Sequence, residues 1–278
     1  MDFEKYLPNY KLIKSLQKTA TAETILMQYE DSQRVVKLTY TQNLDEHAKH
    51  LFNQEAVLLK QLKHPNIIEL IDYFTTPNHL VLITNYANSG DLQQFINKQV
   101  RLNQKVKPVQ IFSFIGQICA SLSYLKQNKI IHRDIKPANI FLDKIDKKLI
   151  VKIGDFGVSK ILDATVNAQT VVGTLQYISP ELALQQKYSY ETDAWALGVT
   201  LYELIEWKTP FDDVNLKCKL DRIIRGDFTP LNCDVKEFEV IVNGLLKVVP
   251  KERLTVQQIG EAGNVKKVMD MLGIYNNQ

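Results

Sequence analysis

Two short segments of the chain carry the residue types that phosphate chemistry requires. Residues 132–139 read HRDIKPAN, and Asp155, Phe156 and Gly157 follow a hydrophobic run. A carboxylate can accept the proton of a hydroxyl group, and carboxylate and amide oxygens are ligands that Mg²⁺ prefers. The lysine of the first segment offers positive charge near the phosphate that is transferred. The two segments together indicate phosphoryl transfer.

The HRD and DFG sequences, in this order, resemble those of eukaryotic protein kinases. The resemblance covers residues 10–260 and implies an α+β fold with two lobes, a small antiparallel sheet with one helix and a larger, mainly helical lobe. The lysine of HRDIK and a later GTxxY sequence are similar to Ser/Thr kinases rather than tyrosine kinases. The sequences IGDFGVSK and DAWALG look most like the NIMA-related group.

Composition excludes several other classes of protein. The chain has 278 residues, 45% of them hydrophobic, which is enough to bury a large core. A net charge of +3 is too balanced to favour nucleic acid or an anionic membrane as a partner. Three scattered cysteines, and no apolar run of transmembrane length, favour a cytoplasmic protein. Nuclear or cytoskeletal association and the oligomeric state stay open.

The first lobe, residues 1–84, is expected to hold strands at 35–38, 67–74 and 80–84 and a helix at 45–62. Helical spacing puts Glu55 in a stripe with Leu51, Leu58, Leu59 and Leu62. Glu55 could lie at the edge of this stripe and reach solvent. The resemblance to kinases instead pairs it with Lys37, which then holds the α- and β-phosphates of ATP.

The second lobe is expected to be helical. Residues 109–126 place five large apolar side chains on one face, and residues 192–205 are apolar nearly all round, as in a buried helix. The segment 85–91 is short and mostly polar, which suits a hinge between two lobes. The sequence thus predicts a hinge at 85–91, a second lobe at 92–265 and a tail at 266–278.

The resemblance assigns catalytic or metal-binding roles to four polar residues of the two segments. Asp134 is the expected catalytic base, Lys136 supplies charge, and Asn139 and Asp155 are the Mg²⁺ ligands. Phe156 is expected to pack under the helix of Glu55, and Gly157 to let the backbone swing. His132 and Phe156, with Leu59 and Leu70, match the residues that link the lobes of active kinases.

ATP is expected to bind between the lobes. Thr84 takes the gatekeeper position, although it could be an ordinary core residue. The backbone of Asn85, Tyr86 and Ala87 is expected to bind adenine, and the resemblance adds two further contacts, Asp91 and Phe141.

The loop that covers the phosphates departs from the kinase pattern. Gln17, Thr19 and Ala22 stand at the three glycine positions, and Thr24 replaces the usual valine. A residue with a Cβ strains a left-handed backbone by about 1–2 kcal/mol. A loop that avoids positive φ would escape this strain but lose phosphate contacts. The departure raises the alternative of a pseudokinase that binds a nucleotide or partners without chemistry. A small-molecule phosphotransferase would lack the sequence at 173–181.

Residues 173–181 resemble the segment that docks protein substrates. Its Glu181 is expected to form a structural ion pair with Arg253, and Asp193 opens the DxWxLG sequence of the buried helix. In kinases with an arginine at the position of Arg133, a phosphate often orders the activation segment. The candidates are Thr165, Thr170 and Thr174, and Thr170 has the spacing of the phosphorylated residue, although it could be a solvated loop residue without a role. The valine after DFG favours Thr over Ser as the acceptor.

Overall fold

The chain folds into two compact units. The computed structural model describes residues 3–42, 44–156, 175–187 and 189–273. Unit 1 ends at Asn88, and unit 2 begins at Ser89. This boundary falls inside the segment 85–91 that the sequence suggests as a hinge.

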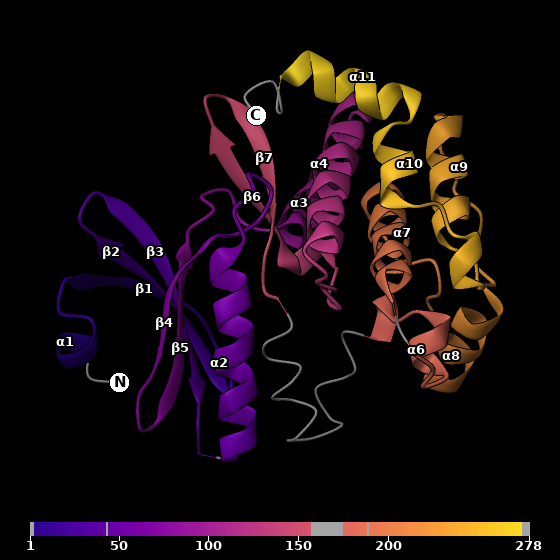
Figure 1. Cartoon of the computed structure of the whole chain (residues 1–278). Coiled ribbons are helices and arrows are strands. Elements are labelled where there is room, and N and C mark those ends of the chain that lie inside the picture. The colour runs from indigo at the N-terminus through magenta and orange to yellow at the C-terminus, as the bar shows by residue number, and fades with distance from the viewer. Residues whose placement is uncertain (1–2, 43, 157–174, 188, 274–278) are drawn as a thin grey trace. The chain divides into compact units, whose positions relative to one another are not determined.

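Unit 1 is a sheet of five antiparallel strands with a long helix beside it (Figure 1). The strands pair in the order β1-β2-β3-β5-β4, and helix α2 packs against β4 and β5. The elements are α1 (Phe3–Tyr6), β1 (Tyr10–Lys18), β2 (Ala22–Tyr29), β3 (Ser32–Tyr40), α2 (Glu46–Gln61), β4 (Leu70–Thr75) and β5 (His79–Asn85).

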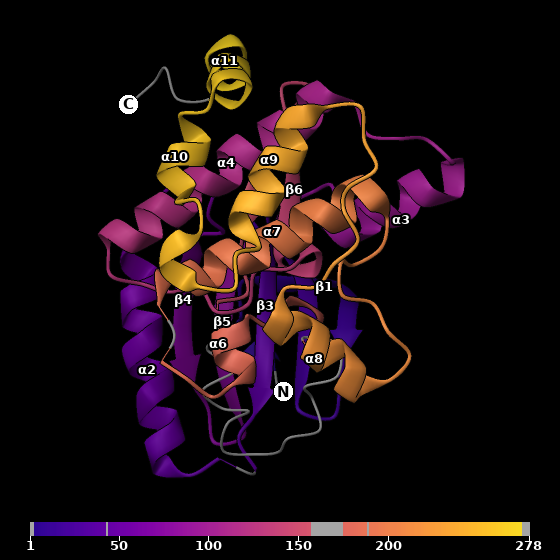
Figure 2. The same cartoon turned by 90° about the vertical axis from the view of Figure 1, so that its right-hand side faces the viewer.

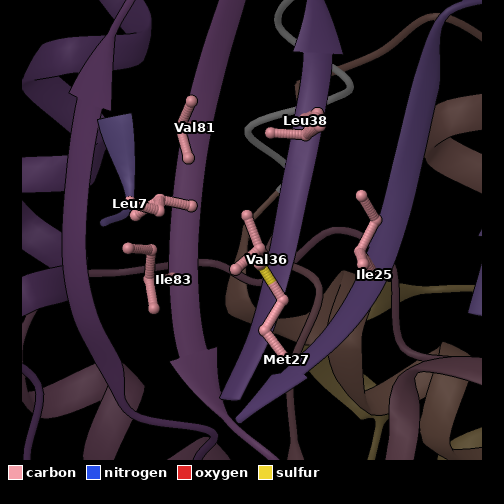
Figure 3. Close-up of a cluster of buried hydrophobic side chains, with 7 residues drawn as sticks. All are labelled: Leu7, Ile25, Met27, Val36, Leu38, Val81 and Ile83. Carbon is pink, nitrogen blue, oxygen red and sulfur yellow. The ribbon is translucent and has the colours of Figure 1, made fainter. Parts of the chain in front are cut away.

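One face of this sheet carries a hydrophobic cluster that Leu7 completes (Figure 3). Leu7 follows α1, and its side chain is 4% exposed. The strand residues of the cluster are Ile25, Met27, Val36, Leu38, Val81 and Ile83. Since side chains alternate along a strand, the residues between these positions face the other side of the sheet. Lys37 and Thr24 are therefore on the face opposite the cluster.

Helix α2 begins after Asp45, whose side chain accepts a hydrogen bond from the backbone N–H of Ala48. The stripe predicted for this helix is confirmed in part. Leu59 and Leu62 are buried and Leu51 is half-buried, whereas Leu58 is 52% exposed, and Ala48, Phe52 and Ala56 complete the buried face. The leucines dominate the sequence pattern, but small alanines allow the closest approach to the sheet. Glu55 is half-buried beside this packed face.

Unit 2 consists mainly of helices (Figure 2) and contains one two-stranded hairpin, which packs against α3 and α4. In it α4 packs against α7, α10, α11 and β7, and α7 also packs against α9. The elements are α3 (Leu92–Leu102), α4 (Pro108–Gln127), η1 (Pro137–Asn139), β6 (Ile140–Ile145), β7 (Lys148–Ile153), η2 (Leu175–Tyr177), α6 (Pro180–Ala183), α7 (Tyr190–Glu206), α8 (Leu216–Arg225), α9 (Lys236–Leu245), η3 (Pro250–Glu252), α10 (Val256–Gly260) and α11 (Gly263–Leu272). Helix α11 continues past residue 266 into the stretch 266–278, for which the sequence suggested a helix end and a tail.

The two central helices of unit 2 match the sequence patterns. All five apolar residues expected on one face of α4 are buried, and residues 192–205 of α7 are buried throughout. By length and composition α4 is also apolar enough to cross a membrane, which the sequence reading did not anticipate. Because 67% of its apolar window is buried inside the protein, α4 has the character of a core helix.

The cluster of Figure 3 predicts an unequal effect of two leucine substitutions. Leu7→Ala removes a buried side chain and is expected to cost about 2–5 kcal/mol of unfolding free energy. Leu12→Ala is the matched control, because Leu12 is 61% exposed on β1, and it is expected to cost under about 0.5 kcal/mol. Urea unfolding measures both. Equal losses would contradict the role of Leu7.

Candidate active site

The β6–β7 hairpin of unit 2 brings the two predicted metal ligands to one end. Ile140 pairs with Ile153, so Asn139 immediately precedes the hairpin and Asp155 closely follows it. The backbone N–H of Gly154 donates to the carbonyl oxygen of Asn139 at 3.0 Å. Pairing of the strands, rather than a local turn, therefore joins the HRD and DFG segments.

Asp134 is oriented by two side chains that the sequence grouped with it. Asn139 donates through Nδ2 to the carboxylate oxygen Oδ2 of Asp134 at 2.7 Å and to its carbonyl oxygen at 2.8 Å. Lys136 Nζ lies 3.0 Å from the same Oδ2. The Asp134 side chain is 13% exposed. The predicted base, cation and ligand are thus in direct contact.

The backbone around Asp134 is held by Asp193 at the start of α7. Its carboxylate accepts from the backbone N–H of His132 at 2.8 Å and of Arg133 at 2.9 Å. Arg133 has a φ of 67°, a left-handed conformation that is unfavourable for a residue with a Cβ. The two charge-assisted bonds offset this strain. Asp193, predicted to be structural, shapes the catalytic loop.

His132 connects this loop to the DFG segment. Its Nδ1 accepts from the backbone N–H of Asp134 at 3.3 Å, so the proton belongs on Nε2, which donates to the carbonyl oxygen of Gly154 at 3.1 Å. The His132 ring also packs on Phe156, with centroids 4.7 Å apart. Within unit 2, His132 and Phe156 are in contact as expected, with the two rings tilted by 49°, and the packing of Phe156 under α2 stays a prediction.

The donor set of unit 2 fits Mg²⁺. Both hydrogen bonds of the Asn139 side chain use Nδ2, so its Oδ1 remains a hard oxygen ligand, and Asp155 adds a carboxylate. No group of three or more His, Cys, Asp or Glu side chains able to hold a metal occurs among the residues that the structure describes. Few protein ligands suit Mg²⁺, which takes its other ligands from water and phosphate.

Unit 1 aligns three predicted nucleotide contacts in one row across its strands. Gln17 of β1 pairs with Thr24 of β2, and Thr24 pairs with Lys37 of β3. Directly opposed residues of antiparallel strands project from the same face. Lys37 therefore lies beside the loop residues, on the face opposite the hydrophobic cluster. Its pairing with Glu55 of α2 stays a prediction.

The end of β5 limits how Asn85 could contact adenine. The backbone N–H of Asn85 donates to the carbonyl oxygen of Glu69 at 3.1 Å, so the predicted contact of Asn85 would use its carbonyl oxygen and stays a prediction. The Asn85 side chain accepts from Arg34 Nη1 at 2.6 Å and donates to Glu69 at 2.9 Å. Adenine recognition through an N–H is thus left to Tyr86 and Ala87. Thr84 precedes them in β5, opposite Val35.

Two further expected contacts meet at the start of unit 2. Asp91 forms a β-bridge with Phe141, and it caps α3 by accepting from the backbone N–H of Gln94 at 2.8 Å. Burial raises the pKa of the Asp91 carboxyl, although hydrogen bonds from Gln94 and Gln93 partly oppose this shift. Asp91 thus has a structural task beside its predicted one.

The turn between β1 and β2 replaces the glycine-rich loop. Strand pairing continues to Lys18 and Glu23. Among the described residues with positive φ, none lies in the stretch 17–24. Of the two forms that the sequence left open, the structure shows the unstrained one.

The ion pair between Glu181 and Arg253 is bidentate and buried. Arg253 Nη2 lies 2.7 Å from Glu181 Oε2, and Nη1 donates to Oε1 at 2.9 Å. The Arg253 side chain is 0% exposed, and its guanidinium packs on the ring of Trp195. Burial by itself raises the pKa of the Glu181 carboxyl, but Arg253 outweighs burial and holds that pKa below its ordinary value.

One buried pair was missed from the sequence. Tyr177, in the expected docking segment, donates to Glu203 Oε2 of α7 at 2.6 Å, and Gln93 of α3 donates to Glu203 Oε1 at 3.2 Å. Burial raises the pKa of both the Tyr177 hydroxyl and the Glu203 carboxyl. A glutamate inside an otherwise apolar helix was the available signal, since a buried carboxylate needs donors. Glu203 anchors the docking segment to α7.

Two predicted residues, Gly157 and Thr170, lie outside the described residues, as does the start of the docking segment at 173 and 174. Their roles stay predictions from the sequence.

Comparison with known proteins identifies the family of this site. A family model described as Protein kinase domain matches residues 15–263. The chain therefore belongs to the protein kinase domain family, and the α+β fold expected from the sequence is confirmed.

Its relatives confirm the likeness to NIMA-related (Nek) kinases. Serine/threonine-protein kinase Nek8 of Danio rerio is 39% identical over 206 residues, 74% of this chain and 29% of that protein. Serine/threonine-protein kinase nekl-2 of Caenorhabditis elegans is 34% identical over 231 residues, 81% of this chain and 64% of its own length. Probable serine/threonine-protein kinase nek3 of Dictyostelium discoideum is 33% identical over 260 residues, 92% of this chain and 23% of its own length. The chain spans less than two thirds of each of these relatives.

The buried ion pair predicts a pH-dependent stability. Glu181→Gln leaves Arg253 buried without its countercharge and is expected to cost about 3–5 kcal/mol at pH 7. Because the folded pKa of Glu181 is depressed, its contribution is complete above the ordinary value of 4.5 and is lost as the pH falls through the folded pKa. The difference in unfolding free energy between wild type and Glu181→Gln should therefore narrow below that pH.

Glu239→Gln provides the matched control for this measurement by urea unfolding. Glu239 pairs with Lys236 at 2.7 Å, but the Lys236 side chain is 85% exposed. An exposed pair contributes about 0–1 kcal/mol. A loss for Glu181→Gln no larger than that for Glu239→Gln would contradict the structural role of the buried pair.

Proposed function

We propose that the chain is an active protein serine/threonine kinase that transfers the γ-phosphate of ATP to Ser or Thr hydroxyls of protein substrates, with Thr slightly favoured. One observation carries the proposal. Asp134 is held by Asn139 and Lys136 at the end of a hairpin that also brings Asp155 close. The names of the relatives as serine/threonine-protein kinases support the same activity.

The residues of unit 2 would act mainly by position and charge. Asp134 accepts the proton of the substrate hydroxyl, and its carboxylate is already fixed by Asn139 and Lys136. Lys136 also places positive charge beside the reacting oxygen, which stabilises negative charge that develops in the transition state. Tyr177 and Glu181 tie the docking segment to α7 and Arg253, so that a peptide substrate meets a fixed surface.

Mg²⁺ and ATP are the expected cofactor and phosphate donor. Asn139 and Asp155 would hold the metal, which when bound neutralises charge on the phosphate oxygens. Lys37 and its row with Thr24 and Gln17 would face the phosphates, with Glu55 orienting Lys37. The backbone of Asn85, Tyr86 and Ala87 would bind adenine, beside Thr84 as the gatekeeper.

A pseudokinase that binds nucleotide or partners is the second candidate, favoured by the missing glycines alone. All six polar residues expected to carry the chemistry are present in the sequence: Lys37, Glu55, Asp134, Lys136, Asn139 and Asp155.

The partners of an active kinase would be its protein substrates. We also propose a cytoplasmic location, which the scattered cysteines favour, with nuclear or cytoskeletal association open.

Substitution of the proposed base Asp134 should strongly reduce turnover and leave nucleotide binding unchanged. Asp134→Asn is expected to lower turnover by about 10³-fold or more, because an amide cannot accept the proton. Nucleotide affinity should stay close to that of the wild type, as the ligands of the metal are untouched. The assay uses labelled ATP, Mg²⁺ and a generic basic protein, and fluorescence titration measures the affinity.

Asp155→Ala is the companion variant, and it should impair metal-dependent nucleotide binding as well as turnover. A wild-type chain that binds Mg²⁺-ATP but transfers no phosphate would favour the pseudokinase. Equal activity of wild type and Asp134→Asn would exclude Asp134 as the base.

Regulation is proposed at Thr170, from the sequence alone. A phosphate there adds nearly two negative charges and can bind the guanidinium of Arg133. Thr170→Ala is therefore expected to lower activity at least several-fold, as measured by the same assay after mass spectrometry of the segment. Thr165→Ala is the control. Full activity of Thr170→Ala, with no phosphate on the segment, would show that activation has another cause.

A further inference from the structure

The turn that replaces the glycine-rich loop is closed by one side chain. The hydroxyl oxygen of Thr19 accepts hydrogen bonds from the backbone N–H of Ala22 at 3.0 Å and of Thr21 at 3.3 Å. The same hydroxyl donates to the carbonyl oxygen of Ala22 at 3.1 Å, and the backbone N–H of Thr19 donates to that carbonyl at 2.8 Å. Two backbone donors therefore converge on a single side-chain oxygen.

Such convergence of backbone N–H groups is the geometry that binds an anion. In a loop that holds phosphate, the acceptor is a phosphate oxygen. Here Thr19 Oγ1 is the acceptor; Thr19, Ala20 and Thr21 are exposed and Ala22 is half-buried, so the turn lies at the protein surface. The turn is adjacent to the row of Gln17, Thr24 and Lys37, where the phosphates would lie.

We propose that the Thr19 hydroxyl occupies a phosphate-binding position of the turn and competes with the nucleotide for the N–H groups of Thr21 and Ala22. This inference rests on the proposed ATP-dependent function. Thr19 is thus a residue that sets affinity for the phosphate chain, and it acts against binding. A nucleotide must displace the hydroxyl before it can accept from these donors.

The expected change in nucleotide affinity follows from the exchange of one hydrogen-bond acceptor, the Thr19 hydroxyl, for another, a phosphate oxygen. A phosphate oxygen gains charge-assisted bonds from the two donors, but the hydroxyl loses its own bonds with the same groups. One net hydrogen bond corresponds to about two- to tenfold in affinity. We expect removal of the hydroxyl to tighten binding of a nucleoside triphosphate by about that factor. Adenosine has no phosphate, so its affinity should not change.

Thr19→Val tests the inference, because valine keeps the β-branched shape of threonine and lacks the hydroxyl. Calorimetric titration of the intact chain with AMP-PNP and Mg²⁺, and separately with adenosine, measures both affinities without turnover. We expect Thr19→Val to bind AMP-PNP about two- to tenfold more tightly and adenosine as the wild type does.

One control variant comes from the same position. Thr19→Ser keeps the hydroxyl and should resemble the wild type. Thermal melting checks that each variant is folded.

Two results would overturn the inference alone: unchanged or weaker AMP-PNP binding by Thr19→Val, or an equal gain for adenosine. Absence of AMP-PNP binding by every form, wild type included, would instead overturn the proposed ATP-dependent function and the inference with it. The two failures are therefore distinguishable.

Discussion

The contact of the Asp193 carboxylate with two successive backbone N–H groups is the constraint on which the candidate active site depends. Asp193 is 5% exposed, and a carboxylate buried to this degree is costly unless strong donors satisfy it. His132 and Arg133 supply them, and in return Arg133 is held in a left-handed conformation. That turn directs Asp134 toward Asn139. The geometry of the proposed base is thus set from α7, a helix far along the chain.

The secondary structure could be predicted largely from periodicity, but the packing faces only in part. Helices α4 and α7 have so many large apolar residues that any phase gives a buried face. In α2 the leucines suggested a stripe that includes Leu58, which is exposed, while Ala48 and Ala56 are buried. Alanine contributes little to a hydrophobic pattern, yet its small side chain permits close packing. Phase in such a helix depends on its neighbours, which a single sequence does not specify.

The contacts of the candidate site could likewise be predicted from the sequence only in part. Asp134, Lys136 and Asn139 lie within one short segment, so their spacing alone indicated a common task. The bond between Tyr177 and Glu203, and the use of the Asn85 N–H by Glu69, join residues brought together only by tertiary structure. For the β1–β2 turn the sequence left two backbone forms open. The choice depended on the Thr19 hydroxyl, whose bonds to its own turn offer the backbone an alternative to a positive φ.

The distribution of backbone strain separates two parts of the proposed machinery. Arg133 and Asp155 both have positive φ. Arg133 precedes Asp134, the proposed base, and Asp155 itself carries the carboxylate that is proposed to bind the metal, so each strained residue helps to orient a group proposed for phosphoryl transfer. Strain of this kind persists only where surrounding contacts enforce it. The turn at Thr19 lacks such strain, since its own side chain satisfies the donors. Orientation of the base is therefore enforced within unit 2, whereas contact with the phosphate chain in unit 1 is open to competition. Changes at the turn should consequently alter nucleotide affinity and leave the geometry around Asp134 intact.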